Sequence, residues 1–402
     1  VLATGNGAVT FNTPHNLQVT NLTLGTGGAA ISPVLSGLFT ISVSGNLLEN
    51  HSTGIASGST SILLNGTGTW SNSNTGPLRN NLTISTLGTI TVSGSVKYNT
   101  GRLEYIQGTV NTGSSTLNIS SATTLNTTSI SGNISWNNIV VTGGIQTLIT
   151  NLTCQNLSYG GTSSSFNQNT LFINGNLTIT SSTSINTGTT LLHMQGTGIW
   201  QNTGSLVGNF VRNNLTLSGT ITIPGAVSFA GGKTLTTTGA SINASTSTLY
   251  LGGNTSTTIN STATWNNITI GGGTQTINSL LTIAGTLTIS TGNPTFAGTS
   301  GFNANNFSCI TAGRVINLAP GKTYNIANSL SLVGTAGSKI TLRSLTTPRA
   351  IFTLPYGATQ NVQFTNATNI DSSLGQNILT SSGTLTNTLN WGIGSGNFFL
   401  MF

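Results

Sequence analysis

Apolar and polar residues alternate with a period of two along most of this chain. In the stretch GTWSNSNTGPLRNNLTISTLGTITVSG (68–94), threonine and serine alternate with the apolar residues Leu82, Ile84, Ile90 and Val92. This alternation is typical of a β-strand that buries one face. Glycine, asparagine and serine stand between the apolar runs, and these residues accept the backbone angles of tight turns. The pattern therefore predicts short strands joined by turns throughout the chain.

The sequence also repeats itself. The segment 68–94 matches GIWQNTGSLVGNFVRNNLTLSGTITIPG (198–225), since both run from a tryptophan through Arg-Asn-Asn-Leu-Thr to a Gly-Thr-Ile-Thr strand. A second pair matches in the same way, SWNNIVVTGGIQTLITNLTC (135–154) and TWNNITIGGGTQTINSLLTI (264–283). The corresponding tryptophans are Trp70 and Trp200 in the first pair, and Trp136 and Trp265 in the second. A block of roughly 130 residues therefore occurs twice, as in repeat architectures.

Tryptophans divide each block again. They stand at Trp70, Trp136, Trp200 and Trp265, so that each follows the previous one at nearly the same interval. We interpret this interval of about 65 residues as a unit of three turns with roughly 20 residues each, which is the size of one solenoid coil. The sequence thus predicts an all-β fold, a parallel β-solenoid (β-helix) built from these units, with little or no α-helix. Tandem β-sandwiches are the alternative, although each such domain usually needs about 100 residues.

Changes in repetitiveness and in charge content along the chain predict three segments. Residues 1–60 are less repetitive, and we expect an N-terminal cap or docking segment there. Residues 61–302 hold the repeats and should form the repetitive solenoid. Residues 303–402 hold most of the charged residues in the later part of the chain. They should form a C-terminal β-helix module that ends in an apolar tail.

Charged side chains are scarce, because only 10 basic and 3 acidic residues occur among 402. An ordinary globular domain has about 25% charged residues. Nucleic-acid binding needs a denser basic stripe with stacking aromatic residues, and no apolar run approaches the roughly 20 residues of a membrane-spanning helix. We therefore expect no nucleic-acid partner and no membrane insertion.

Four motifs in the C-terminal segment carry a resemblance to known proteins. They are GKTYNI (321–326), LVGTAGSKITLRS (332–344), NVQF (361–364) and NTLNW (387–391). This arrangement resembles the terminal module of bacterial and phage surface proteins of the β-helix type. The resemblance implies a parallel β-helix and a location on a virion or on a bacterial cell surface. It carries no catalytic residue over to this chain.

Few residues offer chemistry. The acids are Glu49, Glu104 and Asp371, and their separation in the sequence argues against the paired carboxylates of a glycosidase. His51 lies two residues from Glu49, and we expect these side chains to be a solvated surface pair. Calcium-binding repeats of aspartate and phosphate-binding loops are both missing from the sequence. The expectation is no catalytic residue, no cofactor and no metal.

Two groups of residues are candidates for contact with other molecules. Those for surface or glycan contact are Trp70, Trp136, Trp200, Trp265, Arg343 and Arg349, and those for assembly are Phe398, Phe399 and Phe402. The tryptophans could form an exposed ladder for sugars, but we favour a structural role at a corner of the core. The two arginines belong to a basic stretch that could meet acidic surface polymers. The phenylalanines could cover the last coil or insert into a neighbouring subunit.

These features predict an extracellular structural protein without catalysis, a rigid subunit of a fibre or appendage that acts in attachment or assembly. The setting would be a virion fibre or spike, or a filament or adhesin on a bacterial surface. Its partners would be further copies of itself and cell-surface glycans. The alternative is a glycan-binding or polysaccharide-degrading β-helix enzyme that resembles a tailspike. An ice-binding face would need a strict coil length, which the units lack.

Overall fold

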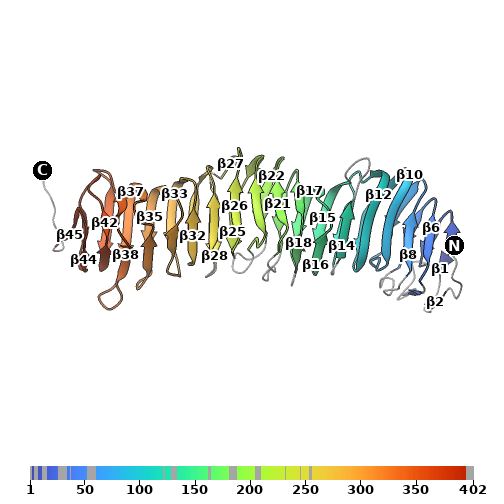
Figure 1. Ribbon diagram of the computed structural model, residues 1–402, viewed down its shortest axis with the longest axis horizontal. Helices are drawn as coiled ribbons and strands as arrows, with labels where there is room; N and C mark the ends of the chain where they lie inside the picture. The colour runs from blue at the N-terminus through green and yellow to red at the C-terminus, as the bar shows by residue number, and fades with distance from the viewer. Residues whose placement is uncertain are drawn as a thin grey trace. The chain divides into compact units, whose positions relative to one another are not determined.

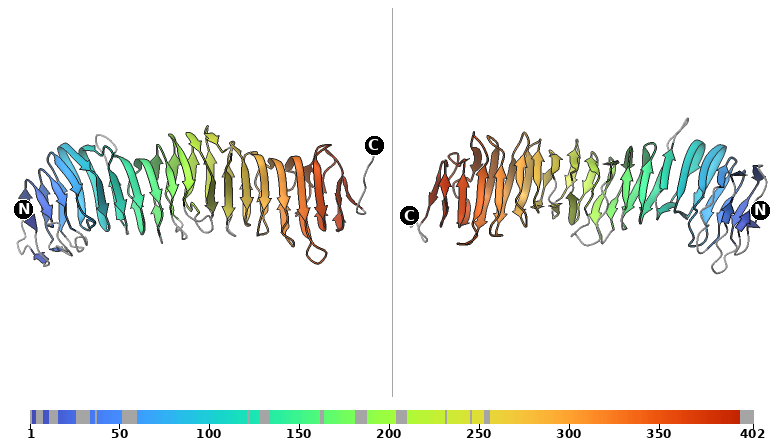
Figure 2. Two further views of the ribbon diagram at one scale, coloured as in Figure 1. Left: turned by 180° about the vertical axis from the view of Figure 1, so that it is seen from behind. Right: turned by 60° about the horizontal axis from the view of Figure 1, so that its bottom comes forward.

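The protein is a β-solenoid of stacked parallel strands, and its described residues contain no helix. The fold predicted from the sequence is therefore confirmed. Figures 1 and 2 show the strands of successive coils lying side by side. The computed structural model describes residues 2–3, 8–10, 16–25, 34–36, 38–51, 60–120, 123–127, 134–161, 164–180, 188–203, 210–230, 232–244, 246–252 and 256–394.

The chain divides into two compact units. The first consists of Val1–Gly198 and Thr203–Asn209, and the second consists of Ile199–Asn202 and Phe210–Phe402. The three segments expected from the sequence, 1–60, 61–302 and 303–402, stay a prediction. The strand β22 (Thr197–Asn202) begins in the first unit and ends in the second.

Most strands of the first unit belong to two parallel sheets. One sheet runs through β1-β4-β7-β9-β10-β12-β14-β16-β18, and the other through β11-β13-β15-β17-β19-β21. The strands are β1 (Leu2–Ala3), β2 (Ala8–Thr10), β3 (Leu17–Val19), β4 (Leu22–Leu24), β5 (Val34–Ser36), β6 (Thr40–Val43), β7 (Leu47–Glu49), β8 (Ser61–Leu64), β9 (Gly68–Asn72), β10 (Asn81–Ser93), β11 (Ser95–Tyr98), β12 (Gly101–Asn111), β13 (Thr116–Ile119), β14 (Thr123–Thr127), β15 (Ser135–Val141), β16 (Ile145–Leu148), β17 (Leu152–Tyr159), β18 (Ser165–Asn167), β19 (Thr170–Ile173), β20 (Leu177–Ile179) and β21 (Leu191–Met194).

The second unit also has two long parallel sheets. One runs through β23-β26-β29-β32-β34-β36-β38-β41-β44, and the other through β25-β28-β31-β33-β35-β37-β39-β42. The strands are β23 (Asn214–Leu217), β24 (Thr220–Thr222), β25 (Ala226–Ala230), β26 (Thr234–Thr237), β27 (Ser241–Asn243), β28 (Thr248–Gly252), β29 (Thr257–Asn260), β30 (Thr264–Trp265), β31 (Asn267–Ile270), β32 (Thr274–Ile277), β33 (Leu281–Ile289), β34 (Thr295–Ala297), β35 (Phe302–Cys309), β36 (Val315–Leu318), β37 (Thr323–Val333), β38 (Ile340–Ser344), β39 (Ala350–Thr353), β40 (Thr359–Gln363), β41 (Thr365–Thr368), β42 (Ile370–Asp371), β43 (Ile378–Thr380), β44 (Leu385–Thr386) and β45 (Trp391–Ile393).

Residues that face each other on neighbouring coils are about 21 positions apart in the sequence. In the first unit Leu82 lies opposite Leu103, which in turn lies opposite Leu125. In the second unit Leu281 lies opposite Phe302. Three such coils account for the unit that the tryptophan spacing predicted.

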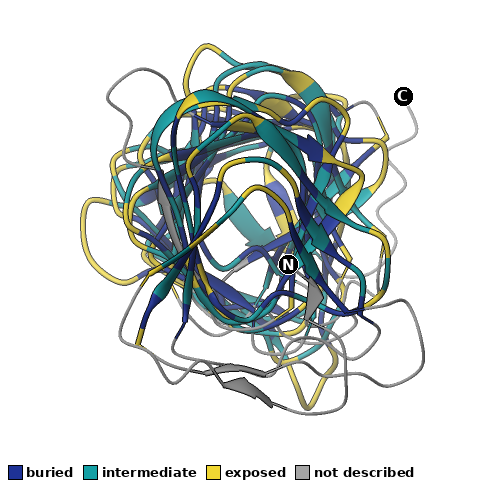
Figure 3. Ribbon diagram, turned by 90° about the vertical axis from the view of Figure 1, so that its right-hand side faces the viewer, coloured by how far each residue is buried: buried dark blue, intermediate teal, exposed yellow. Residues whose placement is uncertain are grey.

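The core is built from the inward-facing side chains of each coil. Along β13, buried Leu117 and Ile119 alternate with half-buried Thr116 and Asn118. A fully buried leucine or isoleucine contributes about 1.5–3 kcal/mol, and one coil supplies only a few of them. A single coil would therefore be unstable, and stacking turns the short apolar runs into a continuous core. Exposed positions lie mainly on the outer turns of the coils (Figure 3).

Candidate functional site

The four repeat tryptophans lie in the core. The indole nitrogen of Trp70 donates a hydrogen bond to Glu49 Oε1 (2.6 Å), and that of Trp265 donates one to Ser261 Oγ (3.1 Å). No ring face remains for a sugar to stack on, so the structure does not support an exposed ladder and places these residues in the core instead. The exposed fractions are 0% for Trp70, 2% for Trp136, 0% for Trp200 and 1% for Trp265.

The two candidate arginines are half-buried and bind asparagines. Arg343 Nε donates to Asn317 Oδ1 (2.8 Å), and Arg349 Nε donates to the Asn387 carbonyl oxygen (2.8 Å). Arg349 Nη2 also donates to the Asn387 side chain. These bonds hold both guanidinium groups along the solenoid surface, and a glycan contact at either one stays a prediction. The assembly candidates Phe398, Phe399 and Phe402 lie outside the described residues.

Glu49 is buried rather than solvated, which corrects the surface pair expected from the sequence. It ends β7, where its side chain shares the inward side of the strand with Leu47, and both are 0% exposed. Its carboxyl accepts hydrogen bonds from Trp70 Nε1 (2.6 Å) and Asn72 Nδ2 (3.1 Å). Burial raises the pKa of Glu49 to about 8, because a carboxylate loses its hydration in the core.

His51, two residues after Glu49 in the sequence, is also buried, with only 1% of its surface exposed. Neither ring nitrogen has a hydrogen-bond partner within the described part of the chain. Burial, together with the charge of Arg79, lowers the pKa of His51 to about 4. Glu49 and His51 are therefore both mainly neutral at pH 7. They are enclosed, so they form a titratable part of the core rather than a site for a ligand.

The second copy of the repeat shows that Glu49 is a local departure from the pattern. The stretch NLLEN (46–50) precedes NLTIT (176–180) by the same step that separates Trp70 from Trp200, and Glu49 thus corresponds to Ile179. Ile179 is fully buried at the inward position of β20. This inward position is therefore apolar in the other copy. In the first copy, two hydrogen bonds stabilise the carboxyl at this position.

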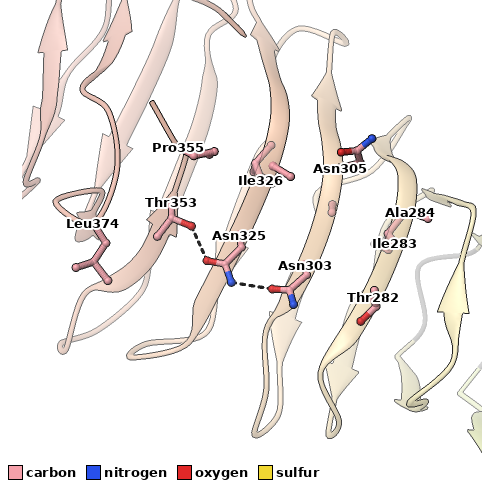
Figure 4. A pocket seen from close by; sticks show the side chains of 12 residues that line it. Thr282, Ile283, Ala284, Asn303, Asn305, Asn325, Ile326, Thr353, Pro355 and Leu374 are labelled. Carbon is pink, nitrogen blue, oxygen red and sulfur yellow. Dashed lines mark hydrogen bonds between the residues drawn. The ribbon is translucent and has the colours of Figure 1, made fainter. Parts of the chain in front are cut away.

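An open groove of about 720 Å³ crosses four neighbouring strands of the second unit (Figure 4). The strands are β33, β35, β37 and β39. Thr282, Asn303, Asn325 and Thr353 line it, and they lie opposite one another in register on successive coils. Because the pairing is parallel and in register, the same kind of polar side chain recurs at each step along the stack.

A relay of hydrogen bonds orients these polar groups. The Thr353 hydroxyl donates to Asn325 Oδ1, and Asn325 Nδ2 donates to Asn303 Oδ1 at 2.7 Å (Figure 4). The relay uses the oxygen of Asn303 and leaves the two N–H donors on its Nδ2 without a protein acceptor in the described structure. The Asn305 amide, also on the groove, makes no side-chain hydrogen bond with the described residues. The groove therefore presents the oriented amide of Asn303 and the unbonded amide of Asn305, both with unused bonding capacity.

The strands that form the groove are irregular in register. The register between β33 and β35 shifts after Ile283, and that between β35 and β37 shifts after Ala304. Such bulges bend a strand and re-aim its side chains. Apolar groups stand beside the amides, since Ala284 and Ala327 are exposed and Leu374 is 72% exposed.

Sequence reasoning missed this groove, although a signal was present. FNANNF (302–307) and YNIAN (324–328) follow each other by one coil length, and both carry asparagine after an inward aromatic residue. A comparison at the step of one coil would have indicated an asparagine column there.

Other site types find no support in the described ranges. No group of three or more histidine, cysteine, aspartate or glutamate residues there could hold a metal ion. None of the described segments is a helix long and apolar enough to cross a membrane. Comparison of the chain with protein-family models, with curated proteins and with solved structures gave no match. Function is therefore inferred from the fold and from its surface chemistry.

Proposed function

We propose that this protein is an extracellular structural subunit of a rigid fibre or appendage, which acts in attachment or assembly. The observation that carries the proposal is the stack of in-register parallel coils around a continuous apolar core. Such a stack resists bending because the neighbouring coils of each unit are hydrogen-bonded to one another, and its length can grow by adding coils. The setting would be a virion or a bacterial cell surface.

The acidic side chains support a role without catalysis. Glu49 is enclosed in the core, and Glu104 Oε1 accepts a hydrogen bond from Arg102 at 2.7 Å. Asp371 Oδ1 binds the backbone nitrogen (2.9 Å) and hydroxyl (2.6 Å) of Ser373, as in a turn. Each carboxyl thus has a structural partner, whereas a glycosidase places two carboxyls on opposite sides of one bond.

The C-terminal end of the described solenoid supports self-association. The strands β43 and β45 form a two-stranded sheet there. Leu379 is 40% exposed, Leu389 41% and Ile393 61%. A terminal sheet edge with apolar side chains favours pairing with another chain. A second copy of this protein is the partner that we propose for that end.

Electron microscopy of the native material that contains this chain tests the proposal. Rods of limited length that project from particles would support a virion fibre, and continuous filaments with an axial repeat near one chain length would support a surface polymer. Particles with neither feature would contradict the structural role.

An enzyme that degrades polysaccharide is the alternative. It would shorten a capsular polysaccharide in solution, and this activity would have to fall in the Glu104→Gln variant. We expect no shortening with either the wild-type protein or the variant.

A further inference from the structure

We propose that the groove across β33, β35, β37 and β39 binds a neutral, linear polysaccharide that lies along the stack of coils. This inference goes beyond the fibre assignment and does not depend on it, because binding can be measured on the isolated full-length chain. It also moves the expected glycan contact away from the repeat tryptophans, which are buried.

The charge of the groove selects the class of ligand. All twelve residues that line it are uncharged. A phosphate, a sulfate or a uronic acid would lose hydration on entering the groove and would find no cation among these residues. A neutral hydroxyl loses much less free energy on leaving water, and it can recover this loss in the groove because it both donates and accepts a hydrogen bond.

The spacing of the groove selects a repeating ligand. Neighbouring strands of a sheet are about 4.8 Å apart, so Thr282, Asn303, Asn325 and Thr353 present polar groups at regular steps. The relay fixes the orientation of the amides before a ligand arrives, which lowers the entropy lost on binding. A chain of sugar units offers hydroxyl groups at comparable intervals along its length.

Apolar groups beside the amides suit the carbon faces of sugar rings. Ala284, Ala327, Pro355 and Leu374 line the groove and are exposed. Tyr356 follows Pro355 and is 85% exposed. Exposed apolar surface next to oriented polar groups is the usual composition of a small-molecule site.

A peptide fits the same surface poorly. Extended peptides bind sheets by adding a strand to a free edge. Here β35 is paired on one side with β33 and on the other with β37, and β37 is paired with β39. The groove therefore offers side chains but no open backbone edge.

Isothermal titration of the full-length chain with defined oligosaccharides tests the inference. The probes are hexasaccharides of β-1,4-glucose, β-1,4-mannose, α-1,4-glucose and β-1,4-N-acetylglucosamine, with oligogalacturonate as the anionic comparison. We expect millimolar or tighter binding of at least one neutral probe and none of the anionic one. Asn325→Ala removes the middle amide of the hydrogen-bond relay. The affinity for the oligosaccharide should then fall about tenfold, for the loss of one to two hydrogen bonds.

Two further variants make the result specific to the groove. Ala284→Arg fills the groove from an exposed position and should abolish binding without disturbing the core. Asn278→Ala removes a similar amide bond, Asn278 Nδ2 to Asn260 Oδ1 at 2.9 Å, that lies outside the groove, and it should bind like the wild type. Failure of all neutral probes, preference for the anionic probe, or equal loss in Asn278→Ala and Asn325→Ala would each overturn the inference. None of these outcomes would contradict the fibre role, which electron microscopy tests separately.

Discussion

The buried carboxyl of Glu49 makes the stability of the first unit depend on pH, and the Glu49→Gln variant should remove that dependence. The carboxyl is fully buried and accepts hydrogen bonds from Trp70 and Asn72. Its pKa is about 8 in the folded protein, against an ordinary value of 4.5. Glutamine has nearly the same shape, keeps an oxygen that can accept the bond from Trp70, and carries no titrating proton.

The direction of the effect follows from proton linkage. Because the pKa of Glu49 is higher in the folded state, its neutral form contributes full stability below pH 4.5, and this stability is lost as the pH rises to about 8. His51 acts in the opposite direction, since its pKa falls from 6.5 to about 4, and its contribution is lost as the pH falls through that range. Between pH 6.5 and 8 Glu49 therefore acts without opposition from His51.

The size of the effect in this window follows from the same values. The window is about 1.5 pH units wide, and each unit corresponds to about 1.4 kcal/mol. Because the folded carboxyl is itself half ionised at pH 8, the free energy of opening the coils around Glu49 should fall by somewhat less than ~2 kcal/mol in the wild type, which is about a 15-fold change in the opening equilibrium. In Glu49→Gln it should stay nearly constant.

Hydrogen exchange with mass spectrometry measures this effect locally, which matters because stacked coils can open in parts. Peptides that cover β7 and β9 should lose protection between pH 6.5 and 8, after correction for the intrinsic exchange rate, in the wild type only. Glu104→Gln is the matched control, because it removes the other glutamate of the first unit, whose partner Arg102 lies on the surface. It should retain the wild-type slope. An unchanged slope in Glu49→Gln, or protection that rises with pH in the wild type, would refute the reasoning.

Three other perturbations test the core and the coil contacts. In His51→Leu nothing opposes Glu49, so protection of β7 and β9 should rise as the pH falls from 6.5 to 4.5, whereas the two contributions nearly cancel there in the wild type. Trp265→Ala should lower the free energy of unfolding by about 3–5 kcal/mol in urea titrations, and a change below about 1 kcal/mol would mean that the ring is not packed. A Cβ at Gly301 would clash with the Thr323 carbonyl oxygen. Gly301→Ala should therefore cost about 1–3 kcal/mol in the same titrations, whereas Gly337→Ala, which meets nothing within 4 Å, should cost far less.

The regular part of the fold could be predicted because each coil repeats one physical requirement. An inward residue at every second position and a turn after each short strand produce a visible pattern, and β13 follows it fully. Trp136 does not follow it. In β15, Trp136, Ile139 and Val141 are all buried, although strict alternation would place Trp136 on the opposite side from the other two. Two half-buried asparagines stand between them, and the inward side changes there.

The groove and the buried carboxyl could not be predicted from alternation alone. Glu49 was expected to be solvated because an isolated charge in a core is costly. The carboxyl can be buried because it is mainly neutral and accepts hydrogen bonds from Trp70 and Asn72. The groove lies where the register shifts after Ile283 and Ala304, and alternation along one strand does not show which residues of neighbouring coils face one another there.

The scarcity of charge in this chain has a physical cause in the stacking itself. Equivalent positions of parallel coils lie about 4.8 Å apart, so a charge copied with the repeat would face its own copy and cost roughly 1 kcal/mol per pair even in water. Asparagine meets its own copy favourably, because its amide both donates and accepts. Asn156 Nδ2 donates to Asn138 Oδ1 at 2.9 Å in the first unit, and Asn325 Nδ2 donates to Asn303 Oδ1 at 2.7 Å in the second. A chain that grows by copying coils is therefore driven toward neutral surfaces lined with amides, and the proposed glycan groove uses the chemistry that the stack already favours.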